Sequence, residues 1–373
     1  MKTEILQENL ARAVSTTAGI ISSSPQLPIL GNIFIKAQKT GLLFIGTNLE
    51  TTISFFVPAK VKEEGEITVP AKTLVELVTT LRPGKIQLSR KGNEVLVSHK
   101  EGEIRLSSLS ADDFPIKSLT LDKKKKPKKI ILPGGELLSL LKRVVFAAAT
   151  DSSRPVLSGV LFKKDKQRLS LVATDGYRLS LAKNDKPLKG ALKKDIVVPV
   201  GALRELEKSL TTDGDVEFFL NREGTQVFFS QNNFILGARL VEGEFPDFAK
   251  IIPSSQQAEV VVDREEMISA LKTMAIFARE SANIVCLKTG KDLTLMARAV
   301  QVGEGDFKLK NAQVKGEEMT IAFNFRFLLD GLGAFGKERV VMAFSSSLAP
   351  VKFTSQKDTS FLHIVMPIRL QDN

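Results

Sequence analysis

The sequence is poor in the residues that most often carry chemistry: one cysteine, two histidines, one tyrosine and no tryptophan. The single cysteine, Cys286, excludes an internal disulfide framework and a metal site of several thiolates, and it is typical of a reducing cytoplasm. The start of the chain, Met1 to Ile5, lacks the apolar segment of a signal peptide. No apolar run approaches the roughly 20 residues that span a bilayer. We therefore expect a soluble cytoplasmic protein without a membrane partner.

Motifs for catalysis and cofactor binding are also scarce. His99 and His363 stand far apart in alternating patterns without a zinc-binding spacing, so we expect ordinary strand residues. Gly84-Lys85 lacks the remainder of a phosphate-binding P-loop, and Gly331-Leu332-Gly333 lacks the third glycine of a dinucleotide site. No pair of carboxylates stands out as an acid–base couple. The sequence therefore predicts no catalytic residue, no metal and no cofactor.

Positive charge is concentrated in one short segment. The net charge is +11, and residues 122–129 contribute +5, compared with +2 from 1–121, +3 from 130–253 and +1 from 254–373. The run Lys123–Lys129 contains Pro127, which blocks a helix, and its like charges repel one another. We interpret the run as a solvated linker, with a direct phosphate contact as the alternative.

The chain repeats itself. Leu27–Asn32 precedes an apolar strand pattern, and Arg154–Gly159 does the same 127 positions later, as do Thr47 and Thr174 within a second matching pair of segments. A length of 373 residues allows two or three domains. With a weaker third copy near the C-terminus, the repeat predicts three. We place domain 1 at 1–121, the lysine-rich linker at 122–129, domain 2 at 130–253 and domain 3 at 254–373.

Each copy has the pattern of an α+β domain. Ile67–Pro70 leads into a predicted helix at 71–81, and Ile196–Pro199 leads into one at 200–210, both starting after proline. The third copy offers helices at 263–279 and 324–335. One apolar stripe, such as Leu10, Ala13 and Val14, predicts that a helix packs on a sheet. The expected domain therefore has two helices on one side of antiparallel sheets.

Five segments carry a resemblance to a known family: Leu27–Asn32, Arg154–Leu157, Leu171–Leu179, Glu244–Asp247 and Ile364–Leu370. Because the five segments occur in this order, the sequence resembles the family of sliding clamps, the beta subunits of bacterial DNA polymerase III. The resemblance extends over essentially the whole chain. The resemblance implies a non-enzymatic processivity factor. It also implies a head-to-tail homodimer, a ring of two sets of three DNA-clamp domains around double-stranded DNA, with strands outside and helices lining the hole.

The resemblance also implies partner proteins and the residues that meet them. The partners are the DNA polymerase III catalytic subunit, the clamp loader and other proteins with a clamp-binding motif, whose extended peptide docks in a groove between the second and third domains. Carried over by position, the groove comprises Arg154, Leu157, Thr174, Gly176, Tyr177, Arg178, Leu179, Pro246, Lys250, Ile251, Val365, Met366, Pro367, Ile368, Arg369 and Leu370. Without the resemblance, Leu157, Leu179, Val365 and Met366 read as ordinary core. Pro367 cannot donate a ladder hydrogen bond, so the last strand is expected to end near it.

The predicted lining helices are only mildly basic. The expected DNA-facing cations are Lys72, Arg82, Lys142, Arg143, Arg204 and Lys208, which are partly balanced by glutamates such as Glu76 and Glu205. Weak, sequence-independent attraction to phosphates suits a ring that slides. A strong DNA binder would carry a denser basic stripe and aromatic stacking platforms.

The resemblance places the dimer interface between a helix with Ile276 and Phe277 and a strand with Ile104 and Leu106. Apolar residues at such an interface and in a core look alike in sequence. Departures from the family pattern at Ser24, at Pro155-Val156 and in the final Gln371–Asn373 leave individual DNA contacts open.

Two other functions remain as alternatives. A monomeric enzyme or carbohydrate-active protein built from repeats would need a cleft with perturbed acids, and the sequence has few histidines and no paired carboxylates. A simple basic nucleic-acid-binding module would bind linear DNA tightly and with strong salt dependence, whereas a clamp would bind linear DNA weakly and stay on circles.

Overall fold

The computed structural model describes residues 1–115, 128–151, 153–165, 168–190, 192–336 and 339–369. Residues 123–127 of the lysine run, and Leu370 of the expected groove, lie outside them. The chain forms two compact units: unit 1 comprises 1–138, 189–191 and 201–240, and unit 2 comprises 139–188, 192–200 and 241–373. No helix among the described residues is long and apolar enough to cross a membrane.

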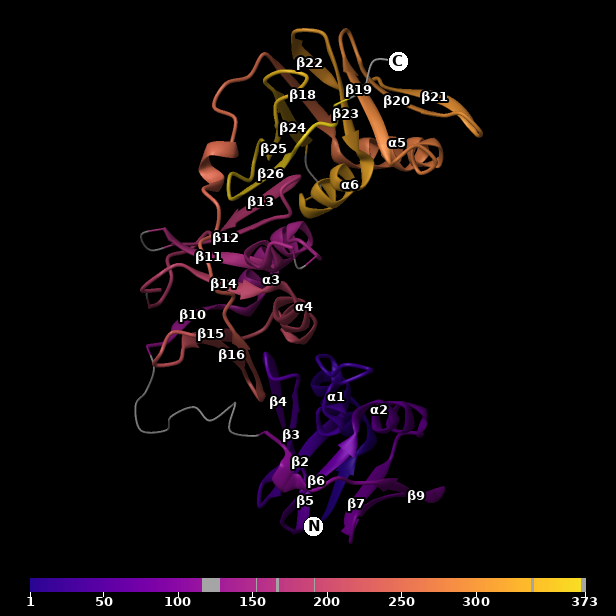
Figure 1. Cartoon of the computed structure of the whole chain (residues 1–373), viewed down its shortest axis with the longest axis vertical. Coiled ribbons are helices and arrows are strands. Elements are labelled where there is room, and N and C mark those ends of the chain that lie inside the picture. The colour runs from indigo at the N-terminus through magenta and orange to yellow at the C-terminus, as the bar shows by residue number, and fades with distance from the viewer. Residues whose placement is uncertain (116–127, 152, 166–167, 191, 337–338, 370–373) are drawn as a thin grey trace. The chain divides into compact units, whose positions relative to one another are not determined.

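Unit 1 contains two antiparallel sheets (Figure 1). The smaller has the order β5-β1-β7-β8-β9, with β5 Lys60–Glu63, β1 Lys2–Leu6, β7 Lys85–Lys91, β8 Glu94–His99 and β9 Gly102–Ser107. The larger has the order β10-β15-β16-β17-β4-β3-β2-β6, with β10 Ile130–Pro133, β15 Asp215–Leu220, β16 Gln226–Gln231, β17 Phe234–Arg239, β4 Thr51–Pro58, β3 Gly41–Thr47, β2 Asn32–Gln38 and β6 Gly65–Pro70. The helices α1 (Gln7–Ala18) and α2 (Ala71–Thr80) lie side by side.

Unit 2 also contains two antiparallel sheets. The larger has the order β14-β11-β12-β13-β26-β25-β24-β18-β22, with β14 Ile196–Pro199, β11 Gly159–Asp165, β12 Arg168–Thr174, β13 Arg178–Lys183, β26 Phe361–Val365, β25 Val351–Ser355, β24 Arg339–Phe344, β18 Ala258–Asp263 and β22 Gln313–Gly316. The smaller has the order β21-β20-β19-β23, with β21 Gly303–Leu309, β20 Leu293–Ala299, β19 Ile284–Thr289 and β23 Met319–Asn324. The helices α5 (Arg264–Ala278) and α6 (Phe325–Ala334) pack against each other.

Two further helices lie where the chain passes between the units: α3 (Gly134–Val144) and α4 (Val200–Ser209). The helix ends agree with the sequence predictions to within one or two residues. Pro70 precedes α2, while Asp263 and Asn324 cap α5 and α6 by accepting hydrogen bonds from the backbone amides of Glu266 and Arg326. Side-chain caps of this kind satisfy amides that have no partner within the helix.

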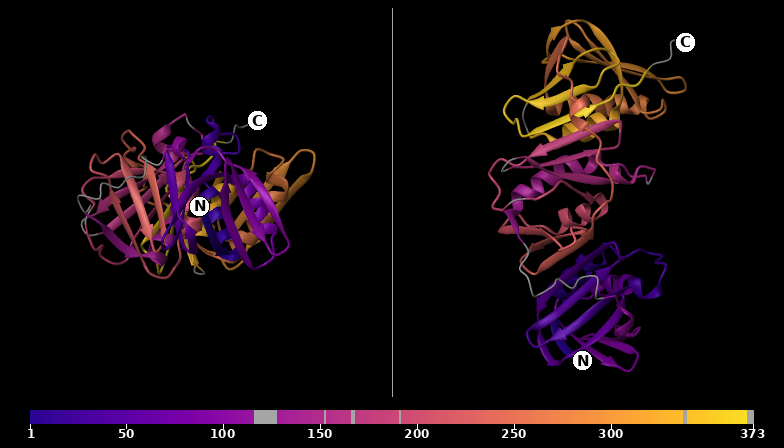
Figure 2. Two further views of the ribbon diagram at one scale, coloured as in Figure 1. Left: turned by 90° about the horizontal axis from the view of Figure 1, so that it is seen from below. Right: turned by 60° about the vertical axis from the view of Figure 1, so that its left-hand side comes forward.

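The two large sheets each continue from one sequence repeat into the next. Strand β4 of the first repeat pairs with β17 of the second, with Phe55 opposite Phe234. Strand β13 of the second pairs with β26 of the third, with Ala182 opposite Phe361. Both members of the second pair are 127 positions after those of the first, so the junctions have the same register. Figure 2 shows β26, in yellow, beside the magenta strand β13.

The repeat also appears in local hydrogen bonding. The Thr47 hydroxyl donates to the Thr51 carbonyl at 3.1 Å, and the Thr174 hydroxyl donates to the Arg178 carbonyl at 2.6 Å. The α+β class with antiparallel sheets, predicted from alternating and helical patterns, is confirmed. The continuous sheets explain why the compact units do not coincide with single copies of the repeat.

Candidate functional site

A rigid turn between β12 and β13 presents the only tyrosine of the chain. The Thr174 hydroxyl accepts a hydrogen bond from the backbone amide of Gly176 at 3.0 Å. The Asp175 carboxylate accepts hydrogen bonds from the backbone amides of Tyr177 and Arg178 at 2.9 and 3.0 Å. Gly176 has φ of +92°, which a side chain rarely adopts. These bonds hold Tyr177, which is 63% exposed, in a defined position.

Arg178 fixes this turn to the first turns of α6. Its guanidinium donates to the carboxylates of Asp175 at 2.9 Å and Asp330 at 2.6 Å, and to the Phe146 carbonyl at 2.8 Å. It also stacks over the Phe327 ring, 4.6 Å from the centroid. Because its donors are already engaged, we infer that Arg178 organises the surface rather than pairing with a ligand.

Tyr177 and Phe327 form an aromatic pair at this surface. Their ring centroids lie 6.5 Å apart with an angle of 22° between the planes. The Tyr177 carbonyl accepts a hydrogen bond from the backbone amide of Met366 at 2.8 Å. Met366, the first residue after β26, is therefore held beside the aromatic pair. We call the surface formed by Arg154, Tyr177, Phe327 and Met366 the Tyr177 surface. Aromatic and arginine side chains of this kind dominate binding at protein interfaces.

The apolar residues expected in the groove divide into buried and partly exposed groups. Leu157, Leu179 and Val365 are at most 2% exposed and belong to the core, as expected from their sequence without the family resemblance. Leu179 lies in a cluster with Leu161, Val172, Leu181, Val197 and Ile364, against which Phe248 and Ile252 also pack. Met366, Pro367 and Ile368 are half-buried. These three, rather than the core residues, are accessible to a ligand.

The C-terminal segment leaves the sheet where proline predicts. Strand β26 ends at Val365, so the expectation drawn from Pro367 is confirmed. Beyond Val365, Ile368 forms an isolated antiparallel β-bridge with Ala322 of β23, in which the Ile368 amide donates a hydrogen bond to the Ala322 carbonyl at 2.8 Å. Arg369 is exposed.

The remaining groove residues come from two other segments of unit 2. Arg154 is exposed, and its guanidinium lies beside Gly176, where a Cβ atom would be 3.2 Å from Nη2. Pro246 and Lys250 are exposed, Lys250 pairs with Asp247 at 3.3 Å, and Ile251 is 37% exposed. Phe327 and Asp330 were not predicted, because they lie in another repeat and carry no local motif.

The cations expected to face DNA differ in how far they are neutralised. In unit 1, Lys72 and Arg204 are exposed and form no ion pair within the described part of the chain. Arg82 pairs with Glu101 at 3.3 Å, and Lys208 pairs with Glu205 at 2.7 Å. The pairs leave little net charge, in agreement with a weak, sequence-independent attraction.

In unit 2, Lys142 is exposed but Arg143 is engaged inside the unit. Its guanidinium lies 2.7 Å from the Asp358 carboxylate, donates to the Ser360 hydroxyl at 3.0 Å and stacks over Phe361. Burial opposes ionisation of Asp358, but the Ser360 hydrogen bonds and the Arg143 charge outweigh it, so the pKa of Asp358 lies below its usual value. Arg143 therefore joins α3 to the β25–β26 turn and has little charge to offer DNA.

The residues of the expected dimer interface lie at the edges of two sheets. One pair is on the edge strand β9, and the other is on α5, which packs against the edge strand β21. Strand β9 is one edge of the smaller sheet of unit 1, with Ile104 half-buried and Leu106 8% exposed. Strand β21 is one edge of the smaller sheet of unit 2, and α5 packs against it. On α5, Ile276 is 59% exposed and Phe277 is half-buried near Gly305.

The turn between β20 and β21 adds two apolar residues that sequence patterns did not single out. Val300 is 96% exposed and Val302 is 50% exposed. Unpaired strand edges with exposed apolar side chains favour association with another chain.

Burial shifts the pKa of two titratable side chains, His363 and Cys286. His363 is 1% exposed, and its Nδ1 lies 2.8 Å from the Ser180 hydroxyl. Burial, reinforced by the nearby Arg178 charge, lowers the pKa of His363 to about 3. Burial raises the pKa of the Cys286 thiol. His363 is therefore a neutral core residue, and the described residues contain no group of three side chains suited to a metal.

Known proteins match this chain over its whole length. Residues 1–120, 131–247 and 249–369 match the models of the N-terminal, central and C-terminal domains of the DNA polymerase III beta subunit. The beta sliding clamp of Chlamydia muridarum is 30% identical, with all of both chains covered, and that of Bacillus subtilis is 27% identical over 99% of this chain and 100% of the relative.

Solved structures give the same result. The sliding clamp of Bacillus subtilis superposes with a TM-score of 0.90 at 26% identity and covers 100% of both chains. The clamp of Pseudomonas aeruginosa bound to griselimycin superposes with a TM-score of 0.91 at 28% identity, covering 99% of this chain and 100% of that one.

Proposed function

Because this chain belongs to the family of DNA polymerase III beta subunits, we propose that its surfaces divide the work of a sliding clamp among partner docking, DNA contact and ring closure. The protein is a processivity factor and not an enzyme. It forms a homodimeric ring around duplex DNA and tethers the DNA polymerase III catalytic subunit, the clamp loader and other clamp-binding proteins. Its site of action is the bacterial cytoplasm.

The mechanism depends on topology rather than on affinity. A closed ring stays on DNA because it encircles the duplex, so strong contacts are unnecessary and would hinder sliding. The paired state of Arg82 and Lys208 supports this mechanism, since each cation is balanced by a glutamate. Lys72, Lys142 and Arg204 supply the remaining diffuse attraction to phosphates. Arg143, which Asp358 neutralises, contributes least.

The three repeats are assigned as domains at 1–121, 130–253 and 254–373, with 122–129 as a linker. The identical register of the β4–β17 and β13–β26 junctions supports this division, because equivalent strands occur at equivalent places in each copy. Each domain contributes two helices and two sheet segments to the ring.

Partner peptides dock on the Tyr177 surface. The observation that carries this assignment is the exposed Tyr177 ring stacked on Phe327 and positioned by the Arg178 network. Met366, Pro367 and Ile368 add half-buried apolar contacts, and Arg154 adds an exposed cation. An extended peptide with a glutamine and a hydrophobic pair suits such a surface.

Ring closure joins the first domain of one protomer to the third domain of its partner. The edge strands β9 and β21 would pair, with Ile104 and Leu106 facing Ile276 and Phe277. Two such junctions, related by a twofold axis, close the ring and leave neither β9 nor β21 as an exposed edge.

The function is tested by retention on circular DNA. The labelled protein is loaded onto nicked circular plasmid by a clamp loader, and the DNA is separated by gel filtration before and after linearisation. We expect the protein to stay with the circle and to leave once the DNA is linear. Equal retention on both forms would favour the simple basic DNA-binding module and contradict a clamp.

A further inference from the structure

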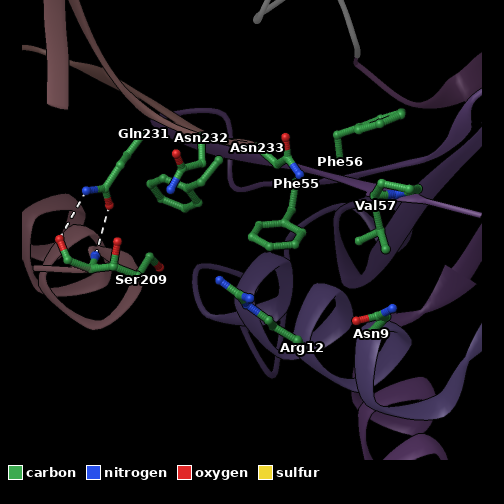
Figure 3. Close-up of a pocket in the computed structure, with 12 residues that line it drawn as sticks. Asn9, Arg12, Phe55, Phe56, Val57, Ser209, Gln231, Asn232 and Asn233 are labelled. Atoms are coloured by element: carbon green, nitrogen blue, oxygen red, sulfur yellow. Dashed lines mark hydrogen bonds between the residues drawn. The ribbon is translucent and has the colours of Figure 1, made fainter. Parts of the chain in front are cut away.

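Arg12 and Lys163 each lie over an aromatic ring, and neither forms an ion pair within the described part of the chain. The Arg12 guanidinium is 5.4 Å from the Phe55 centroid, at a cavity of about 300 Å³ in unit 1 whose other lining side chains are uncharged (Figure 3). It is a single charge on α1, so it belongs with the helix cations already described. The Lys163 ammonium is 5.3 Å from the Phe248 centroid in unit 2, and it has further lysines beside it.

Four exposed lysines of unit 2 gather at one corner of its larger sheet, at the end of β11 and just before the edge strand β14. We call them the lysine corner: Lys163, Lys164, Lys193 and Lys194. The two segments lie side by side, because Phe162 pairs with Ile196 and the Lys164 backbone amide donates to the Asp195 carboxylate at 3.1 Å. With six basic and two acidic residues, positions 163–168 and 193–195 carry a formal charge of +4. None of the four lysines forms an ion pair with a described carboxylate.

The lysine corner is continuous with the expected partner groove. Lys163 lies on the same face of the sheet as Leu161, two residues earlier, because side chains alternate along a strand. Leu161 belongs to the apolar cluster against which Phe248 packs. The short helix η6 (Phe248–Ile251) therefore supplies the ring under Lys163 at one end and the groove residues Lys250 and Ile251 at the other.

The strand register sets the distance between Lys163 and the Tyr177 surface. Lys163 is opposite Ser170, and the turn that carries Tyr177 begins after Thr174, the last residue of β12. The four residues from Ser170 to Thr174 correspond to about 13 Å along a strand. An extended peptide advances by about 3.3 Å per residue as well. Side chains four or five positions from its anchor on Tyr177 would therefore reach Lys163.

We propose that the lysine corner binds acidic residues that flank the docking motif of a partner protein. This inference rests on the proposed docking at the Tyr177 surface and deepens it by naming the charge of the partner. A ring with its strands outside places this corner of the sheet away from the encircled duplex, so a protein segment suits it better than DNA. Clustered positive charge without internal partners favours an acidic ligand, and such complementarity selects among partners more than it adds affinity.

The test measures binding of two labelled peptides to the full-length protein by fluorescence anisotropy. Both carry the same glutamine and hydrophobic pair; one has three glutamates on each side, starting four residues from the pair, and the other has glutamines at those positions. We expect the wild type to bind the acidic peptide about tenfold more tightly at low salt, and less than about twofold more tightly at about 0.5 M salt.

Three substitutions together, Lys163→Gln, Lys193→Gln and Lys194→Gln, should remove this preference and leave the affinity for the neutral peptide unchanged. The double variant Lys193→Gln, Lys194→Gln keeps the contact between Lys163 and Phe248 and should reduce the preference to about threefold.

The matched control removes three exposed charges elsewhere in unit 2 and should keep the full preference: Lys291→Gln, Lys310→Gln and Lys315→Gln. Equal loss of the preference in the two triple variants overturns the proposal, as does a wild type that binds both peptides equally. It is also overturned if a single-stranded oligonucleotide binds the corner more tightly than the acidic peptide does, since the corner would then be a nucleic-acid site. Failure of the proposed docking is distinguishable, because the neutral peptide would then not bind the wild type at all.

Discussion

Gly331 in α6 lies so close to His363 in β26 that a Cβ atom at position 331 would be 2.2 Å from the imidazole Cδ2. The contact explains a glycine in the middle of a helix, where it costs about 1 kcal/mol relative to alanine. It also explains Gly331-Leu332-Gly333, which resembles part of a nucleotide-binding motif but here permits helix–sheet packing.

Gly331→Ala should therefore destabilise the protein by about 1–3 kcal/mol, because the new Cβ would overlap the buried His363 ring. Gly333→Ala is the matched control, since nothing lies within 4 Å of a Cβ at that position. It should be neutral or stabilising by up to about 1 kcal/mol. Urea unfolding of both variants measures the difference, and equal stability would contradict the steric explanation.

His363 should make stability depend on pH. The pKa of His363 is about 3 in the folded protein, compared with 6.5 as its ordinary value, so between these values the unfolded chain binds the additional proton. The unfolding free energy should consequently fall as the pH decreases from 6.5 toward 3, by about 1.4 kcal/mol per pH unit from this group.

His363→Gln removes the titrating group and should flatten the unfolding free energy in that window, although the variant is less stable at pH 7. Chemical unfolding from pH 7 to pH 4 compares the two slopes. An unchanged slope in the variant would mean that other groups account for the acid sensitivity.

Tyr177→Ala should weaken a peptide that carries a glutamine and a hydrophobic pair by about 2 kcal/mol, or roughly thirtyfold, because an exposed aromatic anchor is lost. Isothermal titration calorimetry gives the affinity. Leu348→Ala, which truncates another exposed apolar residue of unit 2 at 54% exposure, is the control. Equal affinities would remove Tyr177 from the docking site.

Deletion of residues 366–373 should abolish binding of the same peptide while dimerisation and thermal stability change little. Within its described part, residues 366–369, the backbone amides of Met366 and Ile368 donate to the carbonyls of Tyr177 and Ala322. Met366→Ala keeps both bonds and is the sharper test of the side chain. Full affinity in the truncated dimer would refute the assignment of one wall to this segment.

Ile276→Asp together with Phe277→Asp should convert a dimer of about twice 40.9 kDa into a folded monomer, because an unpaired carboxylate at an apolar interface is costly. Ile276→Asp alone is less disruptive to the protomer, since Ile276 is 59% exposed whereas Phe277 is half-buried. Light scattering measures the mass, and circular dichroism measures the fold. A dimeric double variant would place the interface elsewhere.

Replacing the six lysines of the run 123–129 by serine should flatten the salt dependence of loading but leave the ring on nicked circles. The reason is that diffuse charge accelerates encounter, whereas retention depends on closure. Loss of retention would assign the run an essential role.

Local patterns in the sequence were sufficient for the repeat and for the helix ends. Pro70, Asp263 and Asn324 each mark the beginning of a helix, because capping depends on residues a few positions apart. Pro367 likewise predicted the end of β26, because a missing amide is a local property.

Other features were decided only when distant segments came together. The pairs Tyr177–Phe327 and Arg178–Asp330 join residues about 150 positions apart, and Arg143–Asp358 joins residues 215 positions apart. No periodicity connects such residues, because each contact joins elements that come together only in the folded chain: α6 with the start of β13, and α3 with the β25–β26 turn. The sequence by itself determined three copies of an antiparallel α+β domain and their family. The tertiary structure decided which arginine is neutralised and which remains available, because a charge is set by its neighbours in space.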